Sequence, residues 1–428
     1  MHAIKKILLS SYGMTLFKKG VVILTGLLSV VFMTRYLGPT LKGEYAYYMN
    51  FINIGVSVLN MGISLVYVNY KRQEQRPREF QATFITLSIF QYVFYIGIAV
   101  GMYFLGQSVD YITIMVLIAL NVLSIQLTQI NLVESIKKNT IIAIVTALSN
   151  CALTALIYFI APKYVFIALL VYAAKNIVPI VMTLMAIKSE QLPSALRKQK
   201  QIKVRRWPNI IRQGVLPMVV TCLIALNYRM DILFLGWFNI AASEIGLYST
   251  GVQLAEYAWM LPDVFKEVML NKNAKSDAIN SLTFSIRMAM TLVCLFIAFM
   301  AAFGHYIIIF LFGADFADAY FTTLLMFLAI PFIIYSKIIG TLFSAKGKWS
   351  FYFWTLIVSV VLNGGLNLLF IPMMGIIGSA TASIISYAVC GLLCIIWLKR
   401  NYEIKLRDLL IIKKSDYHMI RTFIKKDS

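Results

Sequence analysis

Twelve apolar runs, each close to or above 20 residues, constrain this chain more than any other feature of its sequence. A helix needs about 20 apolar residues to cross the roughly 30 Å hydrocarbon core of a bilayer. The runs cover residues 10–36, 44–69, 82–106, 111–135, 141–161, 164–187, 213–237, 245–270, 283–304, 319–343, 350–371 and 375–398. The chain is 60% hydrophobic, well above the share of about 45–50% in soluble domains. We therefore predict an all-α polytopic membrane protein with about 12 transmembrane helices.

The charge distribution predicts how these helices are oriented. A net charge of +21 would suit a nucleic-acid partner, but the basic residues are not spread over one surface. With both termini inside, the inner segments hold 29 Lys or Arg residues, and the outer loops hold two, Lys42 and Lys163. Basic residues concentrate in the cytoplasmic loops of membrane proteins. This uneven division of basic residues between inner segments and outer loops predicts an N-in, C-in topology. It also predicts that the basic loops bind anionic membrane lipids and that the protein has no nucleic-acid partner.

One long basic loop divides the chain. It contains Pro193 and Pro208 and separates six apolar runs from the other six. We predict a six-helix bundle at 1–190, a basic cytoplasmic linker at 191–212, a second six-helix bundle at 213–398 and a basic cytoplasmic tail at 399–428. The apolar residues of the tail predict an amphipathic segment on the inner membrane surface, with a solvated tail as the alternative.

Short motifs recur at corresponding positions in the two halves. Leu37-Gly38 and Gly43-Glu44-Tyr45 follow the first run, whereas Leu235-Gly236 and Gly246-Leu247-Tyr248 follow the seventh. The fifth and eleventh runs share an Asn-x-x-Leu-x-x-Leu pattern and a later proline: Asn150 and Pro162 in one, Asn363 and Pro372 in the other. These matches predict a parallel duplication, with two bundles related by a pseudo-two-fold axis along the membrane normal.

Polar residues form stripes on several predicted helices. The second run carries six at steps of three and four, which places them on one face of a continuous helix. They are Asn50, Asn53, Ser57, Asn60, Ser64 and Tyr67. Such a stripe can join helices, but its length favours a face that lines an aqueous cavity.

Thirteen ionisable residues lie within the predicted helices, where charges usually mark functional positions. The bases are Lys18, Lys19, Arg35, Lys175, Arg229, Lys266, Arg287 and Lys337, and the acids are Glu134, Asp231, Glu256, Asp263 and Glu267. The excess of bases favours an anionic substrate such as a pyrophosphate, because Arg and Lys both bind phosphate oxygens. Lys18 and Lys19 could instead extend to the headgroups. No metal site is predicted, since the three histidines are scattered and no carboxylate or histidine joins the cysteines.

Five motifs follow one another along the chain: Arg35-Tyr36-Leu37-Gly38-Pro39, Asn227-Tyr228-Arg229-Met230-Asp231, Ala255-Glu256-Tyr257-Ala258-Trp259, Asn363-Gly364-Gly365-Leu366-Asn367 and Gly378-Ser379-Ala380-Thr381. They resemble the motifs of the Wzx-type polysaccharide flippases, in the polysaccharide-transporter branch of the superfamily that includes MATE drug exporters. The resemblance covers nearly the whole chain and depends on the order of the motifs.

The resemblance implies a flippase of the bacterial cytoplasmic membrane that moves undecaprenyl-pyrophosphate-linked oligosaccharides outward for O-antigen, capsule or related polymers. It implies alternating access driven by a proton or sodium gradient, with no cofactor. Together with the buried charges it suggests three sets of residues. The cationic cavity would use Lys18, Arg35, Lys175 and Arg229; polar contacts to the glycan would use Asn50, Asn53, Asn60, Trp259 and Asn363; ion coupling would use Asp231, Glu256 or Asp263, each of which could instead pair with a neighbouring base.

Two other functions stay open. An exporter of soluble cationic or amphipathic compounds would need an acidic cavity, which the excess of bases disfavours. A membrane enzyme or a scaffold of polysaccharide assembly is the other alternative, and a polysaccharide polymerase complex is a candidate partner. We predict that the protein is not an enzyme, because the predicted outer loops are short and the sequence shows no catalytic cluster.

Overall fold

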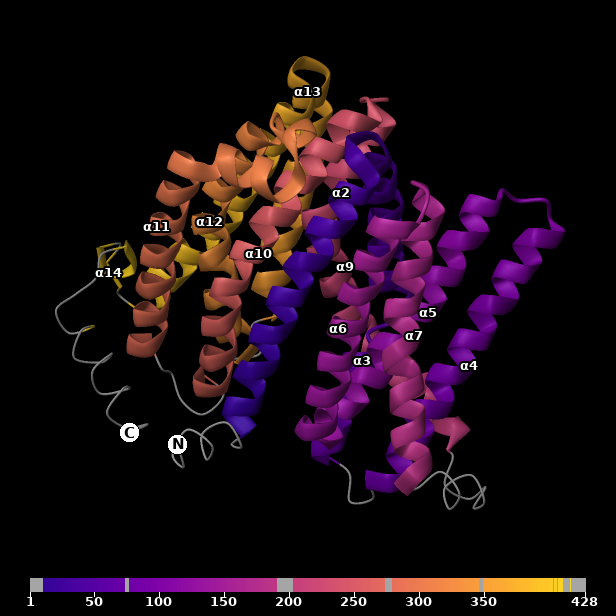
Figure 1. Cartoon of the computed structure of the whole chain (residues 1–428). Coiled ribbons are helices and arrows are strands. Elements are labelled where there is room, and N and C mark those ends of the chain that lie inside the picture. The colour runs from indigo at the N-terminus through magenta and orange to yellow at the C-terminus, as the bar shows by residue number, and fades with distance from the viewer. Residues whose placement is uncertain are drawn as a thin grey trace, which may run out of the picture. The chain divides into compact units, whose positions relative to one another are not determined.

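The computed structural model describes residues 11–73, 77–190, 203–273, 279–345, 349–402, 404–405, 407–410 and 416. Within these residues every regular element is a helix (Figure 1). The elements are α2 (Ser11–Leu59), α3 (Ile63–Gln73), α4 (Pro77–Phe104), α5 (Val109–Glu134), α6 (Ile136–Ile160), α7 (Val165–Glu190), η2 (Val204–Arg206), α9 (Trp207–Trp237), α10 (Ala242–Asn273), α11 (Ile279–Phe312), η3 (Ala314–Phe316), α12 (Ala319–Ala345), α13 (Trp349–Tyr402) and α14 (Arg407–Leu410).

Nine helices within the described residues are long and apolar enough to cross a membrane. Two of the nine, Phe17–Leu59 and Ser350–Tyr402, each span most of two of the twelve predicted segments. Both change direction at a glycine with a positive φ angle, Gly38 in α2 and Gly375 in α13. A further helix, α10, covers the predicted segment 245–270. These lengths and compositions are those of a multi-pass membrane protein, while the count of twelve stays a prediction.

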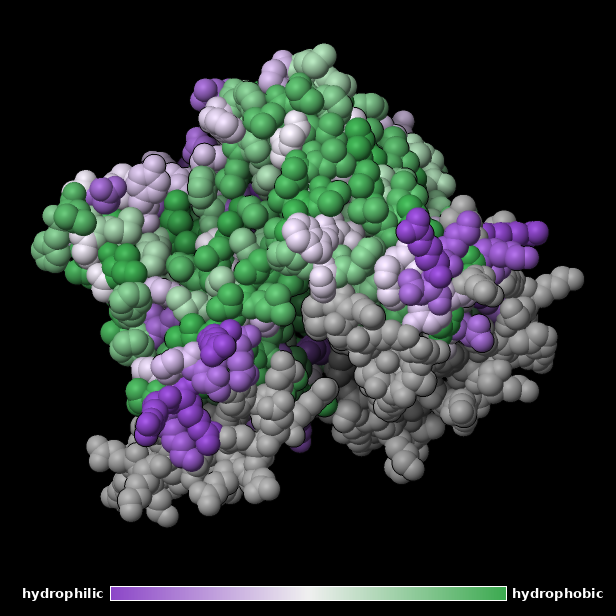
Figure 2. All heavy atoms as spheres, turned by 180° about the vertical axis from the view of Figure 1, so that it is seen from behind, coloured by the Kyte–Doolittle hydropathy of each residue, from purple (hydrophilic) through white to green (hydrophobic). Residues whose placement is uncertain are grey.

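The surface agrees with a lipid environment. Figure 2 shows that hydrophobic residues cover most of the described part of one face of the molecule. Large apolar side chains that are more than half exposed include Phe104, Phe159, Phe310 and Met373. Apolar patches of this extent are unusual on soluble monomers, but they are expected where lipid tails surround a protein.

The chain divides into two compact units, Met1–Arg229 and Met230–Ser428, which we call unit 1 and unit 2. The division falls within α9. Ile210, near the beginning of α9, is fully buried in a core cluster of unit 1 together with residues of α3, α4 and α5. The predicted linker 191–212 lies partly outside the described residues, which resume at residue 203.

The two units pack corresponding helices in the same pairs. In unit 1, α4 contacts α5, α2 contacts α5, and α5 contacts α7. In unit 2, the corresponding pairs are α11 with α12, α10 with α12, and α12 with α13. A duplication would produce this pattern, because each half would keep the pairs of packed helices that were present in the ancestral bundle. The axis relating the halves stays a prediction.

The second predicted helix differs from the structure. We expected one helix over 44–69, but α2 ends at Leu59 and α3 begins at Ile63. Met61 and Gly62 between them have φ angles of 48° and 63°, in the left-handed region that ends a helix. The polar stripe from Asn50 to Tyr67 therefore does not follow one continuous helix face.

Side chains from two other helices satisfy the carbonyl groups that this break releases. Gln91 and Tyr95 of α4 donate to the carbonyl oxygen of Leu59 at 2.7 and 2.8 Å. Gln126 of α5 donates to the Asn60 side-chain oxygen at 3.1 Å. An unsatisfied carbonyl within a bilayer would cost several kcal/mol. These amides explain how a break can persist inside a membrane-spanning segment.

The break also packs directly against α9 within unit 1. A methyl group on Gly214 would lie 2.0 Å from the carbonyl oxygen of Met61, and one on Gly62 would lie 2.2 Å from the carbonyl oxygen of Gly214. Neither obstacle is a flexible side chain, since both are backbone atoms. Glycine is therefore required at both positions for the two backbones to approach this closely.

We expect Gly214→Ala to destabilise the protein. Overpacking costs about 1–3 kcal/mol, which should lower the apparent melting temperature in detergent by about 2–10 °C. Gly97→Ala on α4 is the matched control, because no atom lies within 4 Å of the added methyl group. Equal melting temperatures for the two variants would show that the contact between Met61 and Gly214 is not tight in the folded protein.

Candidate functional site

A buried carboxylate lies at the centre of a polar cluster in unit 2. Asp231 of α9 is 3% exposed. Tyr248 of α10 donates a hydrogen bond of 2.7 Å to its Oδ2 atom, and Ser383 of α13 donates one of 2.6 Å to the same atom. Asn367 of α13 approaches Oδ1 at 3.4 Å through its amide nitrogen. Two helices, α10 and α13, thus bring neutral polar groups to one carboxylate on α9.

The hairpin formed by α13 supplies most of this cluster. The hydrogen bonds join Ser359 to Ser386, Asn363 to Ser383 and Asn367 to Ser379, so the residue numbers rise in one half of α13 as they fall in the other. This pairing shows that the two halves run antiparallel on either side of Gly375. All six of these side chains are fully buried. The fold therefore aligns two polar faces beside Asp231.

Small residues allow α13 to approach this closely. A methyl group on Gly378 would lie 2.3 Å from the carbonyl oxygen of Phe370, so only glycine fits where the second half of α13 passes the end of the first. Gly364 faces α9 beside the cluster, and a methyl group there would lie 3.3 Å from the end of the Met230 side chain. The glycine-rich stretch around Asn363 thus positions its amide next to Asp231.

The electrostatics of Asp231 are unusual. Within the part of the chain that the structure describes, no Lys or Arg forms an ion pair with this residue. Burial of an ionised carboxylate without an opposite charge is very costly, so such a group takes up a proton or a cation. The hydroxyl and amide oxygens of Tyr248, Ser379, Ser383 and Asn363 are suitable ligands for a hard cation, and hydroxyl groups also suit a protonated carboxyl.

A cluster of basic and tyrosine side chains lies in unit 1. Tyr172 of α7 accepts a hydrogen bond from Asn121 of α5 and lies within electrostatic range of Arg229 and Tyr45. The Lys42 ammonium lies 5.9 Å from the centre of the Tyr45 ring. Lys42, predicted in an outer loop, is instead a helical residue of α2 and is 3% exposed. We call Lys42, Tyr45, Tyr172 and Arg229, together with Lys175 one turn from Tyr172 on α7, the basic cluster.

Lys175 follows Tyr172 by one turn of α7 and is exposed. The exposed apolar residues of this helix form a single stripe of Phe166, Leu170, Ile177, Val181 and Met185, which is suited to lipid contact. Lys175 lies roughly 160° around the helix from Ile177, at 3.6 residues per turn. Lys175 is therefore an exposed residue on the side of α7 away from the lipid stripe. Inside a membrane, such a charge needs water or an anionic partner.

The other predicted residues have varied surroundings. Lys18 and Arg35 are half-buried on α2, and the structure does not assign them to the basic cluster. Glu256 is half-buried on α10, and the side chain of Asp263 lies outside the described residues. Asn53 is half-buried, and Asn60 is at the break between α2 and α3. The hydrogen-bond partners of Asp231 among the described residues are Tyr248, Ser383 and Asn367, and Glu256 is not one of them.

Three of the predicted glycan contacts are buried by protein. Asn50 donates its amide to the carbonyl oxygen of Ala46 at 2.6 Å. Trp259 packs edge-on against Tyr387, with the Lys337 ammonium 6.0 Å from its ring. Asn363 is fully buried beside Ser383 and Ser386. These side chains could reach a glycan only in another conformation, so their predicted role remains a prediction.

The sequence did not identify the partners of Asp231. Tyr248 appeared only as part of a repeated turn motif, and Ser379, Ser383 and Asn367 had no predicted role. The spacing could have revealed them, because Asn363 and Asn367 are four residues apart and Ser379, Ser383 and Ser386 follow at steps of four and three. Two such polar faces on either side of a glycine indicate a helical hairpin with a polar seam.

The chain matches several solved membrane-protein structures. No family model and no curated protein matches it by sequence. The lipid II flippase MurJ, in an inward closed conformation, is similar at a TM-score of 0.73 with 16% identity over 96% of this chain and 92% of that one. An inward-facing multidrug resistance MATE family transporter of the MOP superfamily is similar at a TM-score of 0.66 with 13% identity, over 89% and 96% of the two chains.

A third similar structure is a MOP superfamily transporter from Pyrococcus furiosus Vc1, whose binding pocket has a reverse polarity that suggests a different function for that protein. It matches at a TM-score of 0.57 with 12% identity, over 93% of this chain and 95% of that one. Identities this low establish the fold alone. The chain therefore has the fold shared by MATE transporters of the MOP superfamily and the MurJ flippase.

Proposed function

We propose that this protein is a flippase that moves lipid-linked oligosaccharides from the inner to the outer leaflet of the bacterial cytoplasmic membrane. The substrate would be a glycan on undecaprenyl pyrophosphate, used for O-antigen, capsule or a related polymer. The proposal rests on the resemblance of the sequence motifs to Wzx-type flippases and on the shared fold. Its mechanism would be alternating access without covalent chemistry, so we propose a transporter and not an enzyme.

The position of Lys175 is the observation that carries this proposal. Lys175 is an exposed residue on the side of α7 away from the lipid stripe, one turn from Tyr172, and the basic cluster to which we assign it contains two further bases, Lys42 and Arg229. A pyrophosphate carries several negative charges, and Arg and Lys side chains are its usual protein partners. Tyr45 and Tyr172 add aromatic surfaces and hydroxyl groups that suit a sugar. The basic loops would bind anionic lipids, and a polysaccharide polymerase complex would receive the product.

Asp231 supports a coupling mechanism for the same transporter. Its carboxylate is surrounded by neutral groups, so its charge is best balanced by a proton or a sodium ion. Binding of that ion on one side of the membrane and release on the other would supply the energy for transport. A gradient would then serve as the only energy source, with no cofactor.

We expect Ser383→Ala to weaken ion binding. Ser383 bonds directly to the Asp231 carboxylate, and a hydrogen bond to a charged group contributes about 1.5–3 kcal/mol. The half-saturating concentration of the coupling ion for transport should therefore rise about tenfold or more. Thr381→Ala is the control on the same helix, because the Thr381 hydroxyl bonds to the Ile377 carbonyl of its own turn. If Ser383→Ala and Thr381→Ala showed the same dependence of transport on the ion, Ser383 would not be part of the ion-binding site.

Lipid analysis tests the proposed function. The gene would be deleted from its native host and the lipid-linked glycans extracted and identified by mass. We expect one glycan on undecaprenyl pyrophosphate to accumulate in the deletion strain and to disappear on complementation with the wild-type gene. Unchanged lipid-linked glycans would contradict the proposal. Altered resistance to cationic amphipathic compounds would instead favour the second candidate, a MATE-like exporter, which the shared fold also allows.

A further inference from the structure

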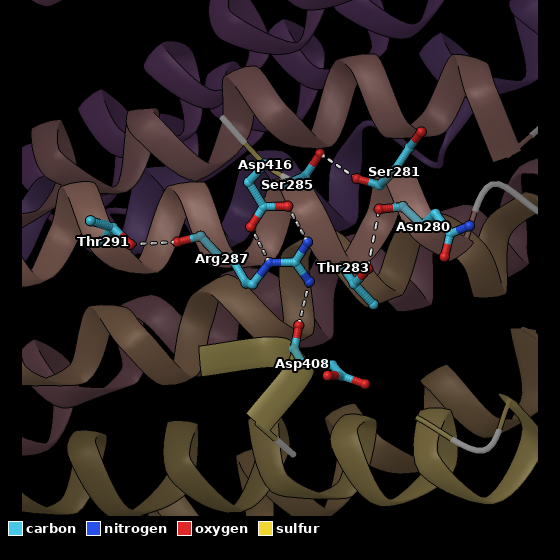
Figure 3. Close-up of polar contacts among 8 residues, drawn as sticks. All are labelled: Asn280, Ser281, Thr283, Ser285, Arg287, Thr291, Asp408 and Asp416. Carbon is cyan, nitrogen blue, oxygen red and sulfur yellow. Dashed lines mark hydrogen bonds and ion pairs between the residues drawn. The ribbon is translucent and has the colours of Figure 1, made fainter. Parts of the chain in front are cut away.

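Unit 2 contains a second buried charge, Arg287, whose partner lies in the segment that follows α13. Arg287 lies near the beginning of α11 and is 3% exposed. Its Nε and Nη2 atoms bond the two carboxylate oxygens of Asp416 at 2.7 and 2.5 Å (Figure 3). Both side chains are buried, at 4% and 0% exposure. This is a forked arginine–carboxylate pair, the geometry in which such a pair is strongest.

The same Arg287 guanidinium also forms a hydrogen bond to a second residue of the segment that follows α13. Its Nη1 atom donates a hydrogen bond of 2.6 Å to the carbonyl oxygen of Asp408 in α14. Figure 3 shows the guanidinium pointing toward both Asp408 and Asp416. Leu409 and Ile404 are buried, at 2% and 8% exposure, and α14 contacts α11. In the described part of the tail, Ile404 and Leu409 pack on protein whereas Leu410 is exposed, and the predicted membrane-surface location of the tail stays a prediction.

The arrangement joins elements that are distant in sequence. α13 ends at Tyr402. Beyond it, Asp416 bonds to Arg287 of α11, which is 129 residues earlier in the sequence. Loss of one member of a buried pair leaves the other charge uncompensated, which destabilises more than loss of both. Arg287 and Asp416 should therefore behave as a single unit in any mutational test.

We infer that Arg287 and Asp416 form a clasp that makes the C-terminal segment a structural part of unit 2. The clasp fixes the beginning of α11 to the segment that follows α13. In the transport cycle that we propose above, on which this role rests, the helices of unit 2 must move as one body. The clasp keeps α11 and α13 together during that movement, so the tail is needed for transport and not only for membrane attachment.

A double-mutant cycle on the full-length protein tests the clasp. The variants are Arg287→Ala, Asp416→Ala, the exchanged pair Arg287→Asp with Asp416→Arg, and the apolar pair Arg287→Met with Asp416→Leu. Trypsin cleavage after Lys405 or Arg407, both exposed, reports release of the segment, and the apparent melting temperature reports stability. Asp318→Ala, which removes an exposed carboxylate of unit 2, is the control.

We expect each single variant to be cleaved at least about tenfold faster than the wild type and to melt several degrees lower. At least one double variant should recover much of both losses, while Asp318→Ala behaves as the wild type. Wild-type cleavage and melting in the single variants would overturn the clasp, as would double variants no better than the singles. These two measurements need no substrate, so they distinguish failure of the clasp from failure of the proposed function. Wild-type transport by Asp416→Ala would overturn the role in transport.

Discussion

Replacement of Asp231 by asparagine should abolish transport and leave the fold intact. Asparagine has nearly the same shape and can still hydrogen-bond to Tyr248 and Ser383, which contact Asp231 at 2.7 and 2.6 Å. It cannot take up a proton or balance a cation's charge. We expect the rate of transport to fall about 100-fold or more, which corresponds to about 2.7 kcal/mol of lost driving interaction.

The melting temperature provides a second measure of the same variant. Asparagine removes a buried negative charge that no base among the described residues pairs with, so Asp231→Asn should be as stable as the wild type or more stable. A ligand that binds only the folded protein raises its stability. If the coupling ion is sodium, replacing choline chloride by sodium chloride should raise the melting temperature of the wild type but not of Asp231→Asn.

Asp315→Asn is the control for Asp231→Asn, because Asp315 is an exposed carboxylate in the turn η3. It should keep wild-type transport and the wild-type response to the ion. Wild-type transport by Asp231→Asn, at normal abundance in the membrane, would exclude Asp231 from coupling.

Loss of Lys175 or Arg229 should also abolish transport. Both belong to the basic cluster, and an anionic headgroup that enters a membrane protein needs opposite charges to replace its water. We expect Lys175→Ala and Arg229→Ala to insert normally and to export little or no glycan. Lys175→Arg should keep part of the activity, since it keeps the charge but changes its geometry.

Lys163→Ala is the matched control for Lys175→Ala. Lys163 is an exposed lysine just before α7, only 12 residues earlier in the chain. Its variant should export glycan at the wild-type rate, as measured by polymer on the cell surface. Full activity of both Lys175→Ala and Arg229→Ala would contradict the assignment of the basic cluster to the substrate.

The helices were predictable from the sequence because each one is determined by its own continuous run of apolar residues. About 20 consecutive apolar residues can satisfy both the bilayer and the backbone only as a helix. The turn glycine Gly38 also appeared in the sequence as a break between predicted segments, whereas Gly375 was predicted as the first residue of the twelfth segment. The break at Asn60–Gly62 was missed because it lies within an apolar run and is stabilised by Gln91, Tyr95 and Gln126, which are 32 to 66 residues further along the chain than the groups they bond.

The candidate site was predictable only in part, for the same reason. Asp231 and Lys175 stood out because charged residues inside apolar runs are rare. Their surroundings depend on long-range packing: Ser383 is 152 residues from Asp231, and Asp416 is 129 residues from Arg287. No periodic pattern links such pairs, since periodicity shows which residues share one helix face and not which helices meet. Arg287 was therefore counted only among the bases within the predicted helices, and its ion pair with Asp416 was not predicted.

The distribution of the lipid-linked glycan between the two leaflets tests the central claim most directly. Intact and inverted membrane vesicles from wild-type, deletion and Asp231→Asn strains would be treated with a label that cannot cross the membrane and reacts with the glycan. We predict that the glycan accumulates on the inner leaflet in the deletion and Asp231→Asn strains, and that the wild-type gene restores its appearance on the outer leaflet. An unchanged ratio of inner to outer glycan in the deletion strain would contradict the account.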